Sequence, residues 1–174
     1  MKILEHLKEN KVILFIVDSS RYNDAVVEAL KSLPNDGNLV YITSNKTASS
    51  LENFLKNKSI EFKNLVIVDC ITRTIRDVRD KDNIIYIDSP KALSDLSFVL
   101  SGILSKRKRG YIVLDSLNTL LVYQDKPIVA RFILNIANKI RDSTFKSVIF
   151  AADANEHKDF LKEIGIFVDK VVKG

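Results

Sequence analysis

The sequence predicts an α/β fold, a three-layer α/β/α sandwich with a mainly parallel sheet. Short apolar runs without polar alternation, such as Val12–Val17, recur along the chain, and segments with helical periodicity separate them. Strands that are apolar throughout are typical of a parallel sheet that helices cover on both faces. Right-handed crossovers between parallel strands then place the helices in two outer layers.

Each element follows from its local pattern, taken in chain order. The predicted strands are runs rich in aliphatic and aromatic residues: Val12–Val17, Leu39–Thr43, Leu65–Val68, Ile84–Ile87, Tyr111–Leu114, Ser147–Ala151 and Phe167–Val172. The predicted helices are segments whose apolar residues recur three or four positions apart: about 22–33, 48–56, 91–104, 127–141 and 156–164. Pro34 and Gly37 follow the first of these helices, and Ser89-Pro90 provides an N-cap and a first residue for the third.

The length and composition indicate one domain with a core of its own. The chain has 174 residues, and a domain typically has about 150. Its 46% of hydrophobic and 28% of charged residues are typical of a globular protein, which argues against a disordered chain. We therefore expect a single domain over residues 1–174 that begins with a helix over residues 1–11.

Charge and hydropathy predict a cytoplasmic protein that does not contact a membrane. The longest apolar run, Val12–Val17, is far shorter than the roughly 20 residues needed to span a bilayer. The charged N-terminal segment does not resemble a secretory signal. Cys70 is the only cysteine, so an internal disulfide is excluded and a reducing compartment is expected. The net charge of +5 permits binding to nucleic acid without requiring it.

Acidic residues follow five of the predicted strands. They are Asp18, Asp69, Asp88, Asp115 and Asp153. The carboxyl ends of parallel strands meet at one edge of the sheet, where doubly wound folds bind their ligands. Carboxylates at that edge could hold Mg²⁺ and orient phosphate groups.

Helix capping is the alternative interpretation of these carboxylates. Asp and Ser after a strand are favoured N-caps, because their side chains accept hydrogen bonds from the first amides of the next helix. Ser89 is most simply explained in this way, whereas for Asp115 both interpretations stay open. Because five carboxylates at one edge would repel each other, some of them must be capped, paired or solvated.

The order of several segments carries a resemblance to a known family. The segment Gly110–Asp125 reads GYIVLDSLNTLLVYQD, and it follows VYITSNKTASSLENFLKNKSIEFKNLVIVDCIT and YIDSPKALSDLSFVLS. Over about residues 12–172 the chain resembles archaeal RecA-superfamily proteins related to KaiC. The resemblance implies a RecA-like P-loop NTPase fold in which Asp115 occupies the Walker B position and would bind Mg²⁺ through water. It also implies assembly, because such relatives commonly form rings with nucleotide between subunits.

The sequence departs from this family where the family binds phosphate. After the first strand it reads DSSRYNDAVVEAL, without a glycine and without a Lys-Ser or Lys-Thr pair. A P-loop depends on glycine amides that approach the phosphates and on a lysine that neutralises them. Asp18, Ser19, Arg21, Asp115 and Ser116 are therefore the candidate residues of a vestigial nucleotide site, with Asp115 as its metal ligand. We expect no cofactor unless this vestigial site still binds ATP and Mg²⁺.

The densest basic run is Lys106, Arg107, Lys108 and Arg109. It precedes a predicted strand, so we expect it at the sheet edge opposite the carboxylates. Such a run can contact the phosphates of DNA or RNA. A solvated connection is the alternative, because no aromatic residues interleave the basic ones.

A second resemblance, to response-regulator receiver domains, involves other strand ends. Asp18 and Asp69 resemble the acidic site and the phospho-acceptor of that family, and Ser89 resembles its switch hydroxyl. The chain has Ser19 where the receiver pattern has a second acidic residue, and Asp115-Ser116 where it has a lysine.

Together these observations predict a non-catalytic RecA/KaiC-like domain that acts as a regulatory or assembly protein and does not hydrolyse ATP. Its expected partner is a second copy or an active paralogue. Two alternatives stay open. One is a Mg²⁺-dependent nucleotide-binding ATPase or sensor with an unconventional phosphate site bounded by Asp18, Asp69 and Asp115. The other is a nucleic-acid-binding accessory protein that uses Lys106–Arg109.

Overall fold

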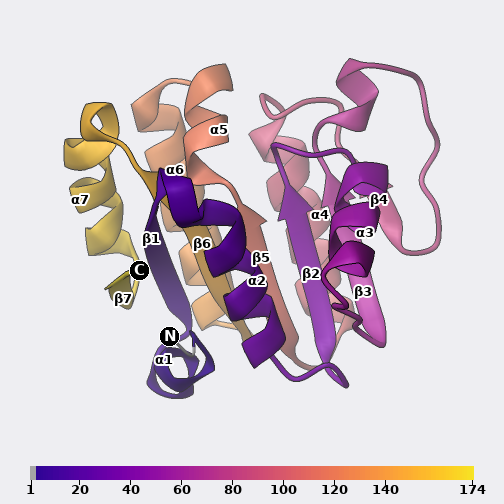
Figure 1. Ribbon diagram of the computed structural model, residues 1–174. Coiled ribbons are helices and arrows are strands. Elements are labelled where there is room, and N and C mark those ends of the chain that lie inside the picture. The colour runs from indigo at the N-terminus through magenta and orange to yellow at the C-terminus, as the bar shows by residue number, and fades with distance from the viewer. Residues whose placement is uncertain (1–2) are drawn as a thin grey trace.

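Seven strands form one sheet in residues 3–174, the part of the chain that the computed structural model describes. The strands are β1 (Val12–Asp18), β2 (Asn38–Thr43), β3 (Asn64–Asp69), β4 (Ile84–Tyr86), β5 (Gly110–Asp115), β6 (Phe145–Asp153) and β7 (Lys170–Lys173). Their order across the sheet is β4-β3-β2-β5-β6-β1-β7, and each pair of neighbours is parallel (Figure 1). The predicted α/β class is therefore confirmed.

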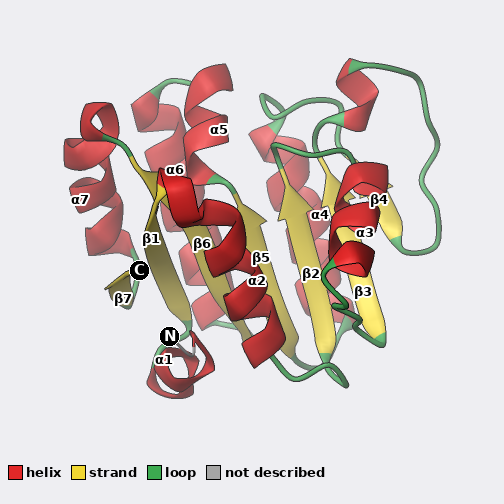
Figure 2. Cartoon of the chain, viewed as in Figure 1, coloured by secondary structure: helices red, strands yellow, loops and turns green. Residues whose placement is uncertain are grey.

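Helices cover both faces of this sheet (Figure 2). They are α1 (Ile3–Glu9), α2 (Tyr22–Ser32), α3 (Ala48–Asn57), α4 (Leu93–Lys106), α5 (Leu117–Tyr123), α6 (Lys126–Arg141) and α7 (Lys158–Phe167), with 3₁₀ turns at Ser19–Arg21, Thr72–Thr74 and Asn155–His157. The core on one face contains residues of α1, α2 and α3. The core on the other face contains residues of α4, α5, α6 and α7.

Burial on both faces explains why the strands are apolar throughout. In β1, Leu14 and Ile16 belong to the core under α4–α7, while Ile13 and Phe15 belong to the core under α1–α3. Alternate residues of a strand point to opposite faces, so both sets must be apolar when both faces are covered. This arrangement leaves the strand ends as the place for polar side chains.

The structure corrects several predicted boundaries. Helix α4 begins at Leu93 rather than near residue 91, because Ser89 accepts the amide hydrogen bond of Lys91 in a turn that precedes the helix. Periodicity did not indicate the seven-residue helix α5. Phe167 ends α7 instead of beginning the last strand.

The N-terminal helix lies where it is predicted, within residues 1–11. Helix α1 spans Ile3–Glu9 and buries Ile3 and Leu7, while residues 1 and 2 lie outside the described part of the chain. In residues 3–174 no helix has the length and apolar character needed to cross a membrane.

Candidate functional site

The strand register brings the predicted carboxylates to one edge of the sheet. In the strand register, Asp18 at the end of β1 lies opposite Asp153 at the end of β6. Thr43 at the end of β2 lies between Asp69 of β3 and Asp115 of β5. The expectation that these strand ends share an edge is confirmed.

The carboxylates nevertheless do not converge on one point. Strands β1 and β3 are separated by β6, β5 and β2, so at a spacing of about 4.8 Å their ends lie roughly 19 Å apart. This distance rules out the receiver-like pairing of Asp18 with Asp69, and it argues against the alternative of one phosphate site bounded by Asp18, Asp69 and Asp115. Among residues 3–174 no group of three or more His, Cys, Asp or Glu side chains could hold a metal ion.

Asp69 is a buried capping residue. Its side chain is fully buried and accepts hydrogen bonds from the amides of Ile71 at 2.7 Å and Thr72 at 2.8 Å. It also accepts from the Thr72 hydroxyl at 2.5 Å and from the amide of Ala48, at the start of α3, at 2.6 Å. These contacts join the end of β3 to α3, so the capping interpretation holds for Asp69.

Asp115 is the centre of a second buried network. Its side chain is 0% exposed. Oδ1 accepts hydrogen bonds from the Tyr22 hydroxyl at 2.7 Å and from Asn45 Nδ2 at 2.8 Å. Oδ2 accepts one from the Tyr41 hydroxyl at 2.6 Å and lies 3.7 Å from Lys46 Nζ. A carboxylate has about four lone-pair positions, and three of them here accept hydrogen bonds from protein side chains.

The four partners of Asp115 come from two neighbouring elements. Tyr22 begins α2, and Tyr41, Asn45 and Lys46 lie on β2 or directly after it. Burial raises the pKa of both tyrosine hydroxyls well above the ordinary value, and the negative charge of Asp115 raises it further. Both hydroxyls therefore remain protonated at neutral pH and serve as hydrogen-bond donors.

Ser44 fixes the backbone around Asp115. Its amide donates to the Asp115 carbonyl oxygen at 2.8 Å, and its hydroxyl accepts from the Ser116 amide at 3.0 Å. Ser116 is the N-cap of α5, since its side chain accepts from the Thr119 amide. The candidate residue Ser116 thus caps a helix.

The other candidate residues lie in the turn after β1. Asp18 caps this turn by accepting hydrogen bonds from the amide and hydroxyl of Ser20, which hold its pKa below the ordinary value. Arg21 pairs with Glu28 at 3.6 Å. Within residues 3–174, no hydrogen bond or ion pair joins Asp18, Ser19 or Arg21 to Asp115. The candidate residues of this turn therefore do not contact Asp115 directly, and Tyr22, which follows Arg21, links the turn to it.

Asp88 and Cys70 have structural roles. Asp88 is exposed and pairs with Arg73 at 3.2 Å, and Arg73 also donates to the Tyr86 carbonyl oxygen at 2.7 Å. The capping interpretation of Asp88-Ser89 is corrected, because Ala92 is the N-cap of α4, Ser89 binds the Lys91 amide in the turn before the helix, and Asp88 pairs with Arg73. Cys70 is buried, which raises the pKa of its thiol to about 12, so its thiol is protonated at neutral pH and unreactive.

The basic run lies at the opposite edge, where it is predicted. It spans the end of α4 and the connection to Gly110, the first residue of β5. Arg107 donates to Asn38 Oδ1 at 2.9 Å, and Asn38 Nδ2 donates to the Arg109 carbonyl oxygen at 2.7 Å. These contacts join the run to the start of β2 and favour a role as a structural connection.

The partners of Asp115 are the residues that sequence reasoning missed. Tyr41 lies within an otherwise aliphatic strand, and a buried tyrosine hydroxyl normally requires a hydrogen-bond partner. This requirement could have indicated Tyr41 as part of a buried polar network. The sequence contains no such indication for Tyr22 and Lys46, because only the packing of α2 and β2 on β5 brings them to Asp115.

Comparisons of the sequence find neither a family model nor a curated protein that matches the chain. Among solved structures, the chain is similar to ATPases 2 and 3 of EssC from Geobacillus thermodenitrificans, with a TM-score of 0.53 and 16% identity. The chain shares its α/β fold with this structure. The match covers 92% of this chain and 29% of that chain, so the likeness concerns the fold and not the activity of EssC as a whole.

Proposed function

We propose that this chain is a non-catalytic, RecA/KaiC-like member of the ATPase fold that acts as a regulatory or assembly protein. The observation that carries the proposal is the buried Asp115 carboxylate, which accepts three side-chain hydrogen bonds and has Lys46 as its ion-pair partner, all within the same molecule. A Mg²⁺ ion bound through this carboxylate would have to displace a tyrosine hydroxyl, Asn45 or Lys46. Each displaced donor would then need another partner in a buried site, which costs free energy.

The turn after β1, where a P-loop would bind phosphate, supports the same proposal. It contains no glycine, so its backbone lacks the close approach to phosphate that a P-loop provides. Asp18 stays ionised because hydrogen bonds from Ser20 lower its pKa, and its negative charge repels phosphate. The Arg21 guanidinium forms an ion pair with Glu28.

We infer a regulatory or assembly role from two features of residues 3–174, the engaged Asp115 carboxylate and the turn after β1 that has no glycine. We propose that the chain pairs with a second copy or with an active paralogue, and that it does so in the cytoplasm. The single, buried Cys70 is consistent with a reducing compartment.

Isothermal titration calorimetry with ATP and Mg²⁺ tests the absence of nucleotide binding. We expect no saturable heat for the wild type. Micromolar binding that is lost in Asp115→Asn and kept in Asp153→Asn would overturn the proposal. Asp153 is the matched control because it also ends a strand at this edge but is exposed.

The partner requires a separate measurement. Sedimentation velocity of the purified chain, alone and with a co-purifying ATPase from the native cell, would show self-association or complex formation. The proposal predicts that adding the chain changes the ATPase rate of that partner. A chain that stays monomeric and alters no co-purifying ATPase would contradict it.

A further inference from the structure

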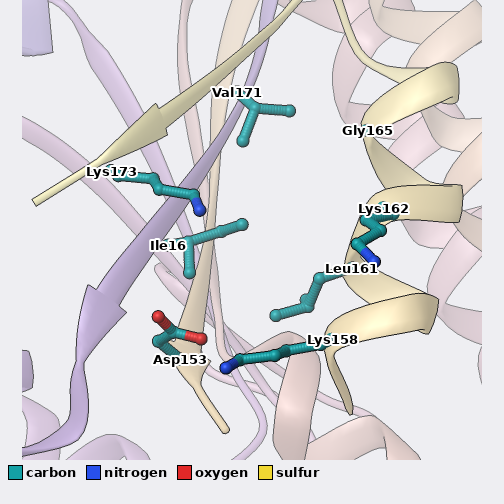
Figure 3. A pocket seen from close by; sticks show the side chains of 8 residues that line it. All are labelled: Ile16, Asp153, Lys158, Leu161, Lys162, Gly165, Val171 and Lys173. Carbon is teal, nitrogen blue, oxygen red and sulfur yellow. The ribbon is translucent and has the colours of Figure 1, made fainter. Parts of the chain in front are cut away.

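A cavity lies between α7 and the edge strand β7, on the face of the sheet that α4–α7 cover. Its volume is about 440 Å³, and Figure 3 shows the side chains that line it. Ile16, Leu161 and Val171 form its apolar part. We infer that this pocket binds a small organic anion with an apolar body, namely an aliphatic or aromatic carboxylate. Pockets that bind small molecules commonly measure about 300–1,000 Å³, and this cavity falls in that range.

Three lysines give the pocket its charge. Lys158 and Lys162 belong to α7, Lys173 belongs to β7, and Asp153 is the only acidic residue in the lining. Three positive charges and one negative charge leave an excess of two positive charges. Lys162 pairs with Asp159 at 3.1 Å, but both side chains are largely exposed. In residues 3–174, no carboxylate lies within ion-pair distance of Lys158 or Lys173, although Lys158 extends toward Asp153 (Figure 3).

Gly165 keeps the pocket open. It lies inside α7, where glycine is about 1 kcal/mol less favourable than alanine. A Cβ at this position would lie 3.1 Å from Val171 Cγ2, across the space between the helix and β7. Glycine, which has a lower helix propensity than alanine, therefore occupies the position in α7 where a side chain would narrow the cavity.

The pocket is independent of the Asp115 network and of the function proposed above. Ile16 and Leu161 belong to the core under α4–α7. Tyr41, which binds Asp115, belongs to the core under α1–α3 on the opposite face. A ligand in the pocket would contact β1, β7 and α7 without reaching Asp115.

Chemical-shift titration by NMR tests the inference with two probes that differ in charge. Phenylbutyrate carries a carboxylate on an apolar body, and phenylbutanol carries a neutral hydroxyl on the same body. We expect phenylbutyrate to shift the amides of residues 161–165 and 171–173 in a saturable manner. We expect phenylbutanol to bind about tenfold more weakly, because ion pairs of exposed lysines contribute modest free energies that add over Lys158 and Lys173.

The double variant Lys158→Gln/Lys173→Gln should weaken phenylbutyrate binding by about tenfold and leave phenylbutanol binding unchanged. Lys170→Gln is the matched control, because Lys170 is exposed on the same strand but does not line the pocket. Equal affinity for both probes, shifts confined to other residues, no saturable binding, or an equal loss in the control would each overturn the inference. Because neither probe is a nucleotide, these outcomes are distinct from failure of the proposed function.

Discussion

At the scale of single residues, neighbouring donors decide what a carboxylate can do. Asp69 and Asp115 both end a central strand and both are fully buried. Three backbone amides and the Thr72 hydroxyl bind Asp69, which makes it a cap, whereas side chains of α2, of β2 and of the segment after β2 bind Asp115. The same residue type at equivalent positions therefore has two different environments, and neither leaves an oxygen open to solvent.

The Tyr41 hydroxyl provides a direct test of the Asp115 network. Tyr41→Phe should lower the free energy of unfolding by about 2 kcal/mol, because it removes a buried hydrogen bond to a charged group. Urea denaturation measures this loss. Tyr111→Phe is the control, since Tyr111 is half-buried on β5 and its hydroxyl donates no hydrogen bond within the described residues. Its expected loss is below about 0.5 kcal/mol. Similar losses in both variants would contradict the network.

At the scale of elements, Asp169 joins three parts of the chain. It precedes β7 and accepts hydrogen bonds from the amides of Lys11 and Val12, at the start of β1, both at 2.9 Å. Arg141, at the end of α6, pairs with it at 2.8 Å. Partial burial raises the pKa of Asp169, but the bond from Val12, the bond and charge of Arg141 and the bond from Lys11 together lower it below the ordinary value.

This lowered pKa predicts how stability depends on pH. The unfolded chain binds a proton at Asp169 at a higher pH than the folded chain does. The contribution of Asp169 is therefore present above about pH 4 and lost as the pH falls through the lowered pKa. Asp169→Asn should be less stable than wild type at neutral pH, and the difference should shrink in acid.

Urea denaturation across this pH range measures the effect. Asp82→Asn is the control, because Asp82 is exposed in the loop before β4 and makes no side-chain hydrogen bond or ion pair in residues 3–174. A constant difference between wild type and Asp169→Asn at every pH would show that Asp169 does not titrate as described.

At the scale of the whole molecule, strand order decides which side chains can meet. The sheet places β5 next to β2, so Asp115 meets Tyr41, and it places β1 two strands away from β5. Tyr22 lies at the start of α2, the helix that follows β1, and its hydroxyl donates a hydrogen bond to Asp115 on β5. The edge that holds ligands in many α/β proteins is here partly occupied by the chain itself.

Metal addition and removal test this conclusion on the intact protein. A ligand that binds only the folded state raises the melting temperature. We expect the same thermal unfolding midpoint, measured by circular dichroism, in excess Mg²⁺ and in excess chelator. A midpoint that rises with Mg²⁺ concentration in the wild type but not in Asp115→Asn would favour the alternative of a Mg²⁺-dependent site.

The fold class, the seven strands and the edge where their carboxylates lie can all be predicted from local sequence patterns. Unbroken apolar strands require cover on both faces, and parallel strands end on one side, so local patterns suffice for these conclusions. What those carboxylates bind depends on how the helices and strands pack. The partners of Asp115 lie between 69 and 93 residues away from it in sequence, and no local pattern links residues so distant. The pocket beside α7 also depends on packing, because Ile16 of β1, near the start of the chain, lines it together with α7 and β7 at the other end of the sequence.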